Sequence, residues 1–147
     1  MSGETIPVYS ANVYEPFGNI DKLLITDFSL PSVLWGIDGD WMTGYIPAGY
    51  EFYPTDHCGV LRCKTELVNP KYMAHILEVE GRKMGFSRSY RASIDRVQGI
   101  TFTVADRKTQ DKIIAKIEKI EAKIHRAEKK LQELTGKTAE ILNKYLN

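Results

Sequence analysis

The last third of the chain carries the most regular hydrophobic pattern. Apolar or small residues recur there at alternating intervals of four and three positions: Ile113, Ile117, Ile120, Ile124, Ala127, Leu131, Leu134, Thr138, Ile141 and Tyr145. A straight α-helix repeats every 3.6 residues, so a stripe that holds a 3.5-residue repeat predicts a helix that winds around a second helix. We expect one helix over 107–147, roughly 60 Å long at 1.5 Å per residue. Gly136 marks either a kink or a point of close approach within it.

The first 106 residues follow a different pattern, in which short apolar runs alternate with turn residues. Such runs predict strands, and the residues between them, rich in Pro, Gly and Asn, predict turns. The expected strands are 6–9, 32–37, 41–46, 51–53, 58–64 and 100–104, with 23–25 either a strand or a short turn. The expected turns are 12–19, 38–40 and 47–49.

Between positions 69 and 97 the spacing becomes helical. Asn69 can cap a helix that Pro70 begins, and Gly85 suits its C-terminal end, so we expect a helix over 70–83 and a helical turn over 92–97. The fold class is therefore α+β. A small mixed β-sheet domain with short helices spans 1–106, and one long coiled-coil helix spans 107–147.

Charge divides the chain at the same boundary. Residues 107–147 hold 11 Lys and Arg against 6 Asp and Glu, whereas residues 1–106 hold 9 against 13. A front domain with a net charge of −4 does not have the composition of a general phosphate binder. Its positive charge is concentrated in the window 82–96, which contains a single acidic residue, Asp95.

Two groups of polar residues resemble catalytic or metal sites. Cys58 and Cys63 lie beside His57, but their spacing does not match a zinc motif, so we expect reduced core thiols and no metal. Asp38 and Asp40 can serve acid–base chemistry, yet Asp-Gly-Asp is also ordinary turn composition. We therefore expect no catalytic site, and keep a small nuclease that uses Asp38, Asp40 and His57 as an alternative.

The stretch Ser87–Arg91 is the polar segment best suited to nucleic acid. Arginine can bind guanine with two hydrogen bonds, and Ser and Tyr can reach phosphates or bases. A solvated loop whose arginines pair with nearby acids is the alternative. The aromatic residues Trp35, Trp41, Tyr45 and Tyr53 are more typical of a core and of strand faces than of base-stacking surfaces.

Several blocks of sequence, in this order, resemble the specificity (S) subunit of type I restriction–modification systems: IPVYSANVYEPFG, PSVLWGIDGDW, YPTDHCGVLRC, NPKYMAHIL and GFSRSYRASIDRV, followed by the long heptad helix. Such subunits carry two target recognition domains, each followed by a spacer helix, and the two helices pack antiparallel. The chain resembles one half of such a subunit, either a half-length subunit or a fragment. The resemblance implies a target recognition domain followed by its spacer helix.

The resemblance also implies a function without catalysis. In that family the S subunit reads double-stranded DNA and docks the modification (methyltransferase) subunits and the restriction subunit. S-adenosylmethionine is bound by the modification subunit, so no cofactor is expected on this chain. We expect a cytoplasmic prokaryotic protein that pairs through its long helix, as a homodimer or with a second half. A coiled-coil protein–protein adaptor with a small globular head is the alternative.

The DNA-contacting residues of that family vary with the target, so the candidates come from side-chain chemistry. Arg88, Ser89, Tyr90 and Arg91 are the leading candidates for base contact. Lys83 is a candidate for phosphate contact. Weaker candidates, on loops that can face the same groove, are Asn12, Asp38 and His57.

Overall fold

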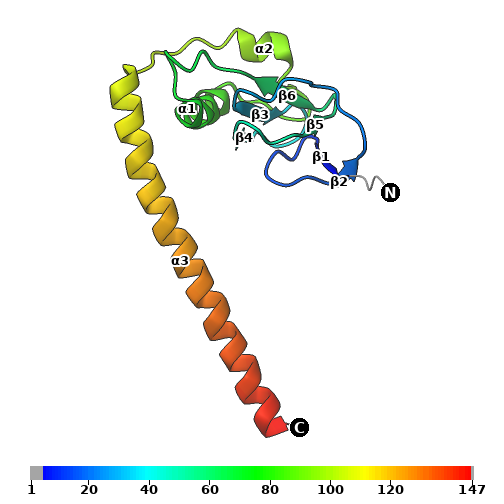
Figure 1. Ribbon diagram of the computed structural model, residues 1–147, viewed down its shortest axis with the longest axis vertical. Coiled ribbons are helices and arrows are strands. Elements are labelled where there is room, and N and C mark those ends of the chain that lie inside the picture. The colour runs from blue at the N-terminus through cyan, green and yellow to red at the C-terminus, as the bar shows by residue number, and fades with distance from the viewer. Residues whose placement is uncertain (1–4, 147) are drawn as a thin grey trace. The chain divides into compact units, whose positions relative to one another are not determined.

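The computed structural model describes residues 5–146 and has a mixed α+β fold, as expected (Figure 1). Two small three-stranded sheets and two short helices precede one long C-terminal helix. The chain divides into two compact units, Met1–Gln110 and Asp111–Asn147. We call the first unit the head. In residues 5–146, no helix is both long enough and apolar enough to cross a membrane.

The first sheet of the head has the strand order β2-β1-β5. Strand β1 (Ile6–Tyr9) pairs antiparallel with β2 (Gly18–Ile20) and parallel with β5 (Tyr53–Pro54). The partners of β1 are therefore a near neighbour in sequence and a strand more than forty residues away.

The second sheet has the order β4-β3-β6, and both of its pairings are antiparallel. Its central strand β3 (Ser32–Gly36) lies between β4 (Thr43–Ile46) and β6 (Cys58–Leu61). All five residues of β3 are buried, because both of its faces are covered.

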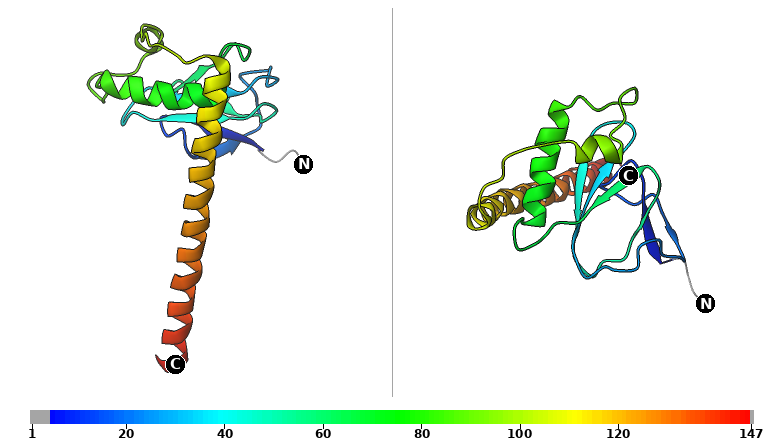
Figure 2. Two further views of the ribbon diagram at one scale, coloured as in Figure 1. Left: turned by 90° about the vertical axis from the view of Figure 1, so that its left-hand side faces the viewer. Right: turned by 90° about the horizontal axis from the view of Figure 1, so that it is seen from above.

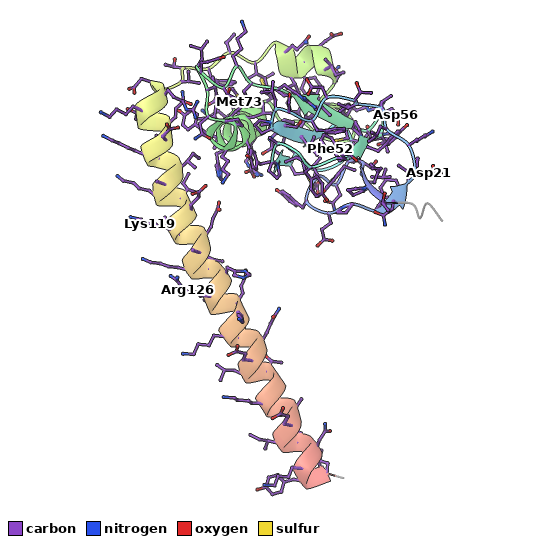
Figure 3. All side chains as sticks on the ribbon, in the orientation of Figure 1. Asp21, Phe52, Asp56, Met73, Lys119 and Arg126 are labelled. Carbon is purple, nitrogen blue, oxygen red and sulfur yellow. The ribbon has the colours of Figure 1, made fainter. Side chains whose placement is uncertain are left out.

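Successive side chains of β3 enter two different cores, since strand residues alternate between the faces of a sheet. Val33 and Trp35 pack with residues of the first helix, whereas Leu34 packs toward the first sheet around the fully buried Phe52 (labelled in Figure 3). The head thus has three layers, with β3 in the middle layer.

Helix α1 (Pro70–Lys83) packs on β3 and β4, as Figure 2 shows for the face of the second sheet. The Asn69 side chain accepts hydrogen bonds from the backbone of Lys71 and Tyr72, and Gly85 follows the helix with a φ of 72°. The predicted helix 70–83 is confirmed. Helix α2 (Ile94–Gln98) begins two residues later than predicted, because Ser93 caps it through Arg96 N.

Some strand predictions were wrong. Residues 100–104 form no strand; Ile100 instead packs against the core beside α1. Residues 23–25, predicted as either a strand or a short turn, form no strand. The predicted turn 12–19 ends early because Gly18 and Asn19 pair with β1. The predicted strand 51–53 is shifted, since Phe52 is used as a core residue and pairing begins at Tyr53.

The long helix α3 (Arg107–Leu146) is continuous over 40 residues, including Gly136. Asp106 precedes it, and its carboxylate accepts hydrogen bonds from the Thr109 backbone N–H (3.0 Å) and hydroxyl (2.8 Å). Most of the predicted apolar stripe is exposed, with Ile120 at 57% and Leu131 at 65%. Side chains project along the whole length of the helix, including the labelled Lys119 and Arg126 (Figure 3).

Candidate nucleic-acid interface

Three loops of the head meet at the backbone of Ile37. Its N–H donates to the His57 carbonyl (2.9 Å), and its carbonyl accepts from the Ala92 N–H (3.0 Å). The buried Trp35 ring N–H then donates to the Ala92 carbonyl (2.9 Å). The hydrogen bonds therefore hold the turn after β3, the loop before β6 and the segment before α2 side by side.

The loop after β1 joins the same place. Thr55 donates its backbone N–H to Tyr9 O (2.9 Å), and its hydroxyl donates to the Ser10 hydroxyl (3.0 Å). At Gly36 a Cβ would lie 2.2 Å from the Ala11 carbonyl oxygen, so only glycine permits this approach of the two backbones. We call residues 10–12, 37–40, 55–57 and 86–92 together the loop cluster.

The Asp38 carboxylate links its own loop electrostatically to two others. Asp38 bonds to the His57 ring through one oxygen and to the Arg91 guanidinium through the other. The His57 hydrogen bond, helped by Arg91, lowers the pKa of Asp38 below its usual value. The Asp38 carboxylate therefore stays ionised at neutral pH and holds Arg91 in one orientation. The exposed Asp56, labelled in Figure 3, lies 3.6 Å from the other ring nitrogen of His57.

The basic segment is a tight turn and not a loose loop. Ser87 and Tyr90 exchange two backbone hydrogen bonds (2.9 and 3.2 Å), and the Ser87 hydroxyl lies 3.1 Å from that of Ser89. The turn is anchored by Phe86, whose buried ring packs 5.1 Å from Trp41. Arg88 and Ser89 are thereby presented at its exposed tip.

Tyr90 is engaged by its own neighbours. Its ring stacks on Phe86 with centroids 5.5 Å apart, and the Arg96 guanidinium lies 4.3 Å from its centroid. Arg96 also donates to the Arg91 carbonyl (2.8 Å). A base could stack on the Arg96 side of Tyr90 only by displacing this arginine, so Tyr90 is better placed to contribute its hydroxyl.

A surface depression of about 740 Å³ adjoins the turn, lined by Asp40, Trp41, Arg82, Phe86, Ser87, Arg88 and Ser89. Within residues 5–146, no carboxylate pairs with Arg88. The other cations of the window 82–96 are held: Arg82 by Glu78 (2.9 Å), Lys83 by Glu80 (2.8 Å), Arg91 by Asp38 and Arg96 by its contacts with Arg91 and Tyr90.

The remaining candidates lie at the margins of this surface. Lys83 is on the last turn of α1, and its exposed i,i+3 pair with Glu80 holds it only weakly. The Asn12 side chain accepts from the backbone of Tyr14 (2.9 Å) and Glu15 (3.4 Å), so it shapes its own loop. It also lines a smaller depression of about 500 Å³.

The cysteines take no part in this surface. Both are buried free thiols, and burial raises the pKa of Cys58 to about 12 and also raises the pKa of Cys63. They are therefore protonated at neutral pH and poor nucleophiles. No three His, Cys, Asp or Glu residues in the described part of the chain gather closely enough to hold a metal ion.

Trp35 and Trp41 are core residues, as predicted, and Tyr45 and Tyr53 are half-buried on strands. Sequence reasoning singled out Asp38, His57 and Arg91 separately, and the structure brings them together. It did not choose Arg82 or Phe86, and it considered Asp40 only for catalysis, yet all three line the depression beside Arg88. The positive charge of the window 82–96 could have pointed to Arg82. Nothing local in the sequence indicates that Asp40 lines the same depression.

Comparison with models of known protein families, with curated proteins and with solved structures finds no match for this chain.

Proposed function

We propose that this chain is the DNA sequence-recognition (specificity) subunit, or one half of it, of a type I restriction–modification system. In this proposal the head reads double-stranded DNA through the loop cluster, and the chain docks the modification subunits without catalysis of its own. S-adenosylmethionine is held by those subunits, and the assembly acts in the cytoplasm of a prokaryote. The observation that carries the proposal is the convergence of the candidate loops beside the unpaired Arg88.

The arrangement of the arginines supports base reading over general phosphate binding. A major groove about 12 Å wide admits a protruding turn such as Ser87–Tyr90. Arg88 at its tip has no ion pair to break, and Arg91 is held in place by Asp38. A pre-oriented guanidinium loses little freedom when it forms two hydrogen bonds with guanine, so Arg91 suits direct readout. Arg88 suits it for the other reason, that it need not leave a carboxylate first.

The charges of the head support the same conclusion. Residues 1–106, with a net charge of −4, repel DNA in general, so binding must come from a matched local surface. Non-specific binding is dominated by phosphate contacts. In the window 82–96, where the positive charge is concentrated, the described contacts hold every cation except Arg88.

The decisive experiment is selection of bound duplexes from a random pool by the full chain, alone and together with modification subunits. We expect enrichment of one bipartite duplex, bound in preference to a scrambled duplex, with an affinity that falls as salt rises. Equal binding to every duplex, or no binding in either preparation, would refute the proposal.

Single substitutions then separate base reading from phosphate contact. Arg88→Ala should lower affinity for the selected duplex roughly 5- to 150-fold and relax the preference at particular base pairs, as expected for loss of a bidentate contact. Lys83→Ala should weaken binding to all duplexes equally. The matched control is Lys64→Ala, because Lys64 is exposed beyond the end of β6 that lies away from the loop cluster.

The exposed stripe of α3 favours a second candidate, a protein–protein adaptor that joins partners through a coiled coil. Both functions use the helix, so the oligomeric state does not distinguish them. The selection does, since an adaptor whose arginines are merely solvated enriches no duplex.

A further inference from the structure

Asp40 carries an exposed carboxylate on a turn that is held at several points. The turn follows β3 and is closed by a hydrogen bond from the Gly36 N–H to the Met42 carbonyl (3.2 Å). Trp41, the next residue, is buried, and its ring N–H donates to the Glu78 carbonyl on α1 (2.9 Å). Within residues 5–146, no Lys, Arg or His side chain pairs with Asp40. Its backbone is therefore fixed in place while its carboxylate is available to a ligand.

Asp40 lines the same depression as Arg88, and the two charges come from different loops. In the described part of the chain no ion pair joins them, so neither has to release the other before it binds a ligand. Trp41 and Phe86, whose ring centroids lie 5.1 Å apart, also line this depression. A ligand that enters it therefore meets a guanidinium, a carboxylate and an aromatic wall.

The chemistry of a carboxylate restricts the bases that it can contact, because an ionised carboxylate accepts hydrogen bonds and donates none. In the major groove only cytosine N4 and adenine N6 present donors. Adenine places the acceptor N7 beside its N6, so it suits an amide side chain and repels a carboxylate. Cytosine places an apolar C5–H beside its N4, which suits a carboxylate next to an aromatic wall. Guanine and thymine present acceptors, and a carboxylate rejects them.

We propose that Asp40 reads a cytosine, by accepting a hydrogen bond from its N4 amino group, at or next to the G·C pair whose guanine Arg88 reads. The role of Asp40 rests on the proposed function, because it requires the loop cluster to enter the major groove. In a G·C pair the cytosine N4 lies beside the guanine O6, so a guanidinium and a carboxylate that share one depression can read one pair or two neighbouring pairs. Phosphates repel a carboxylate, so Asp40 strengthens binding only where a cytosine amino group donates to it.

The test repeats the selection of duplexes from a random pool with the full chain as native protein, Asp40→Asn and Asp40→Ala. The native chain should enrich cytosine at one position. In Asp40→Asn the affinity for the duplex with adenine at that position, relative to cytosine, should rise roughly 5- to 150-fold, because asparagine binds adenine N6 and N7 with two hydrogen bonds. Asp40→Ala should lose the preference at that position and keep the preferences at the others.

The outcomes separate the role of Asp40 from the recognition function. A native chain that enriches no duplex refutes recognition itself, and the role of Asp40 with it. A native chain that enriches a duplex, while both Asp40 variants keep the same base preferences, refutes only the role of Asp40. An equal change in affinity for every duplex also overturns it, because the carboxylate then acts through its charge alone.

The matched control is Asp21→Ala, which removes the same charge elsewhere on the head. Asp21 is exposed and follows β2, whose last residue Ile20 pairs with Ile6 at the start of β1. It therefore lies at the end of the first sheet away from Tyr9, where the chain enters the loop cluster (Asp21 is labelled in Figure 3). Asp21→Ala should leave every base preference unchanged. A loss of the cytosine preference in this control as well would count against a contact by Asp40.

A modified base tests the hydrogen bond directly. N4-methylcytosine at the selected position replaces the amino hydrogen that faces the major groove with a methyl group. The native chain should bind this duplex about 5-fold or more weakly than the unmodified one, since the donor is lost. Asp40→Ala should bind the two duplexes with nearly equal affinity, because it lacks the acceptor. An equal loss in the native chain and in Asp40→Ala would overturn the contact.

Discussion

Replacing Gln110 by methionine should destabilise the head by about 2–4 kcal/mol, because Gln110 ties three backbone segments together. Its side chain is fully buried. The Oε1 atom accepts from Asn69 N–H (2.8 Å), and the Nε2 atom donates to the carbonyls of Leu67 (3.2 Å) and Ala105 (2.7 Å). Methionine has a similar length and packs well but cannot replace these bonds. Each buried backbone group left without a partner costs about 1 kcal/mol or more.

Urea unfolding followed by tryptophan fluorescence measures this change in the head alone, since both tryptophans, Trp35 and Trp41, lie there. The midpoint should fall while the slope stays the same, which identifies a change in stability and not in compactness. The control is Gln98→Met, because Gln98 is exposed at the end of α2 and should change stability by less than about 0.5 kcal/mol. A loss below 1 kcal/mol for Gln110→Met would refute the reasoning.

Three further substitutions test local parts of the fold. Thr43→Val should destabilise the head by about 1 kcal/mol in urea, because the buried hydroxyl donates to Ala74 O (2.9 Å) across the contact between β4 and α1. Asp106→Ala should lower the helicity of the first turn of α3 by circular dichroism and cost about 1 kcal/mol, the usual effect of removing an N-terminal cap. The pKa of Asp38 is lowered in the folded head. Its ionised carboxylate therefore contributes fully to the stability of the head above the ordinary pKa of 3.8, and this contribution is lost as the pH falls through the lowered pKa. The free energy of unfolding, measured across this acid range, should depend less on pH in Asp38→Asn than in the native chain.

The elements that the sequence predicts best are those whose signals are local. The helix over 70–83 begins and ends at the predicted residues, because Asn69 and Gly85 act on the backbone directly beside them. The long helix likewise follows from a repeat that is visible without any tertiary contact. Burial of Cys58 and Cys63 was also predictable, since free cysteines behave as small apolar residues.

The features that escaped prediction depend on contacts between distant residues. Residues 100–104 alternate like a strand, but in the structure described for residues 5–146 they belong to neither sheet and connect α2 to α3. The parallel pairing of β1 with β5 and the meeting of the loops at Ile37 join segments tens of residues apart. The candidate residues could thus be chosen from their chemistry, whereas their convergence at one surface could not.

In the proposed function, the acidic charge of the head and the single unpaired arginine of the loop cluster both limit how tightly one head binds DNA. Each head is acidic overall, and Arg88 is the cation of the loop cluster that no ion pair holds. Because the salt dependence of DNA binding reflects the number of phosphates neutralised, a single head should bind weakly and with a shallow slope. Two linked heads raise the effective concentration of the second contact, which can strengthen binding 100-fold or more without any new residue. Occupancy of a bipartite site should therefore depend on pairing through α3. A lysine in the stripe, Leu131→Lys, should reduce DNA binding although position 131 lies outside the loop cluster.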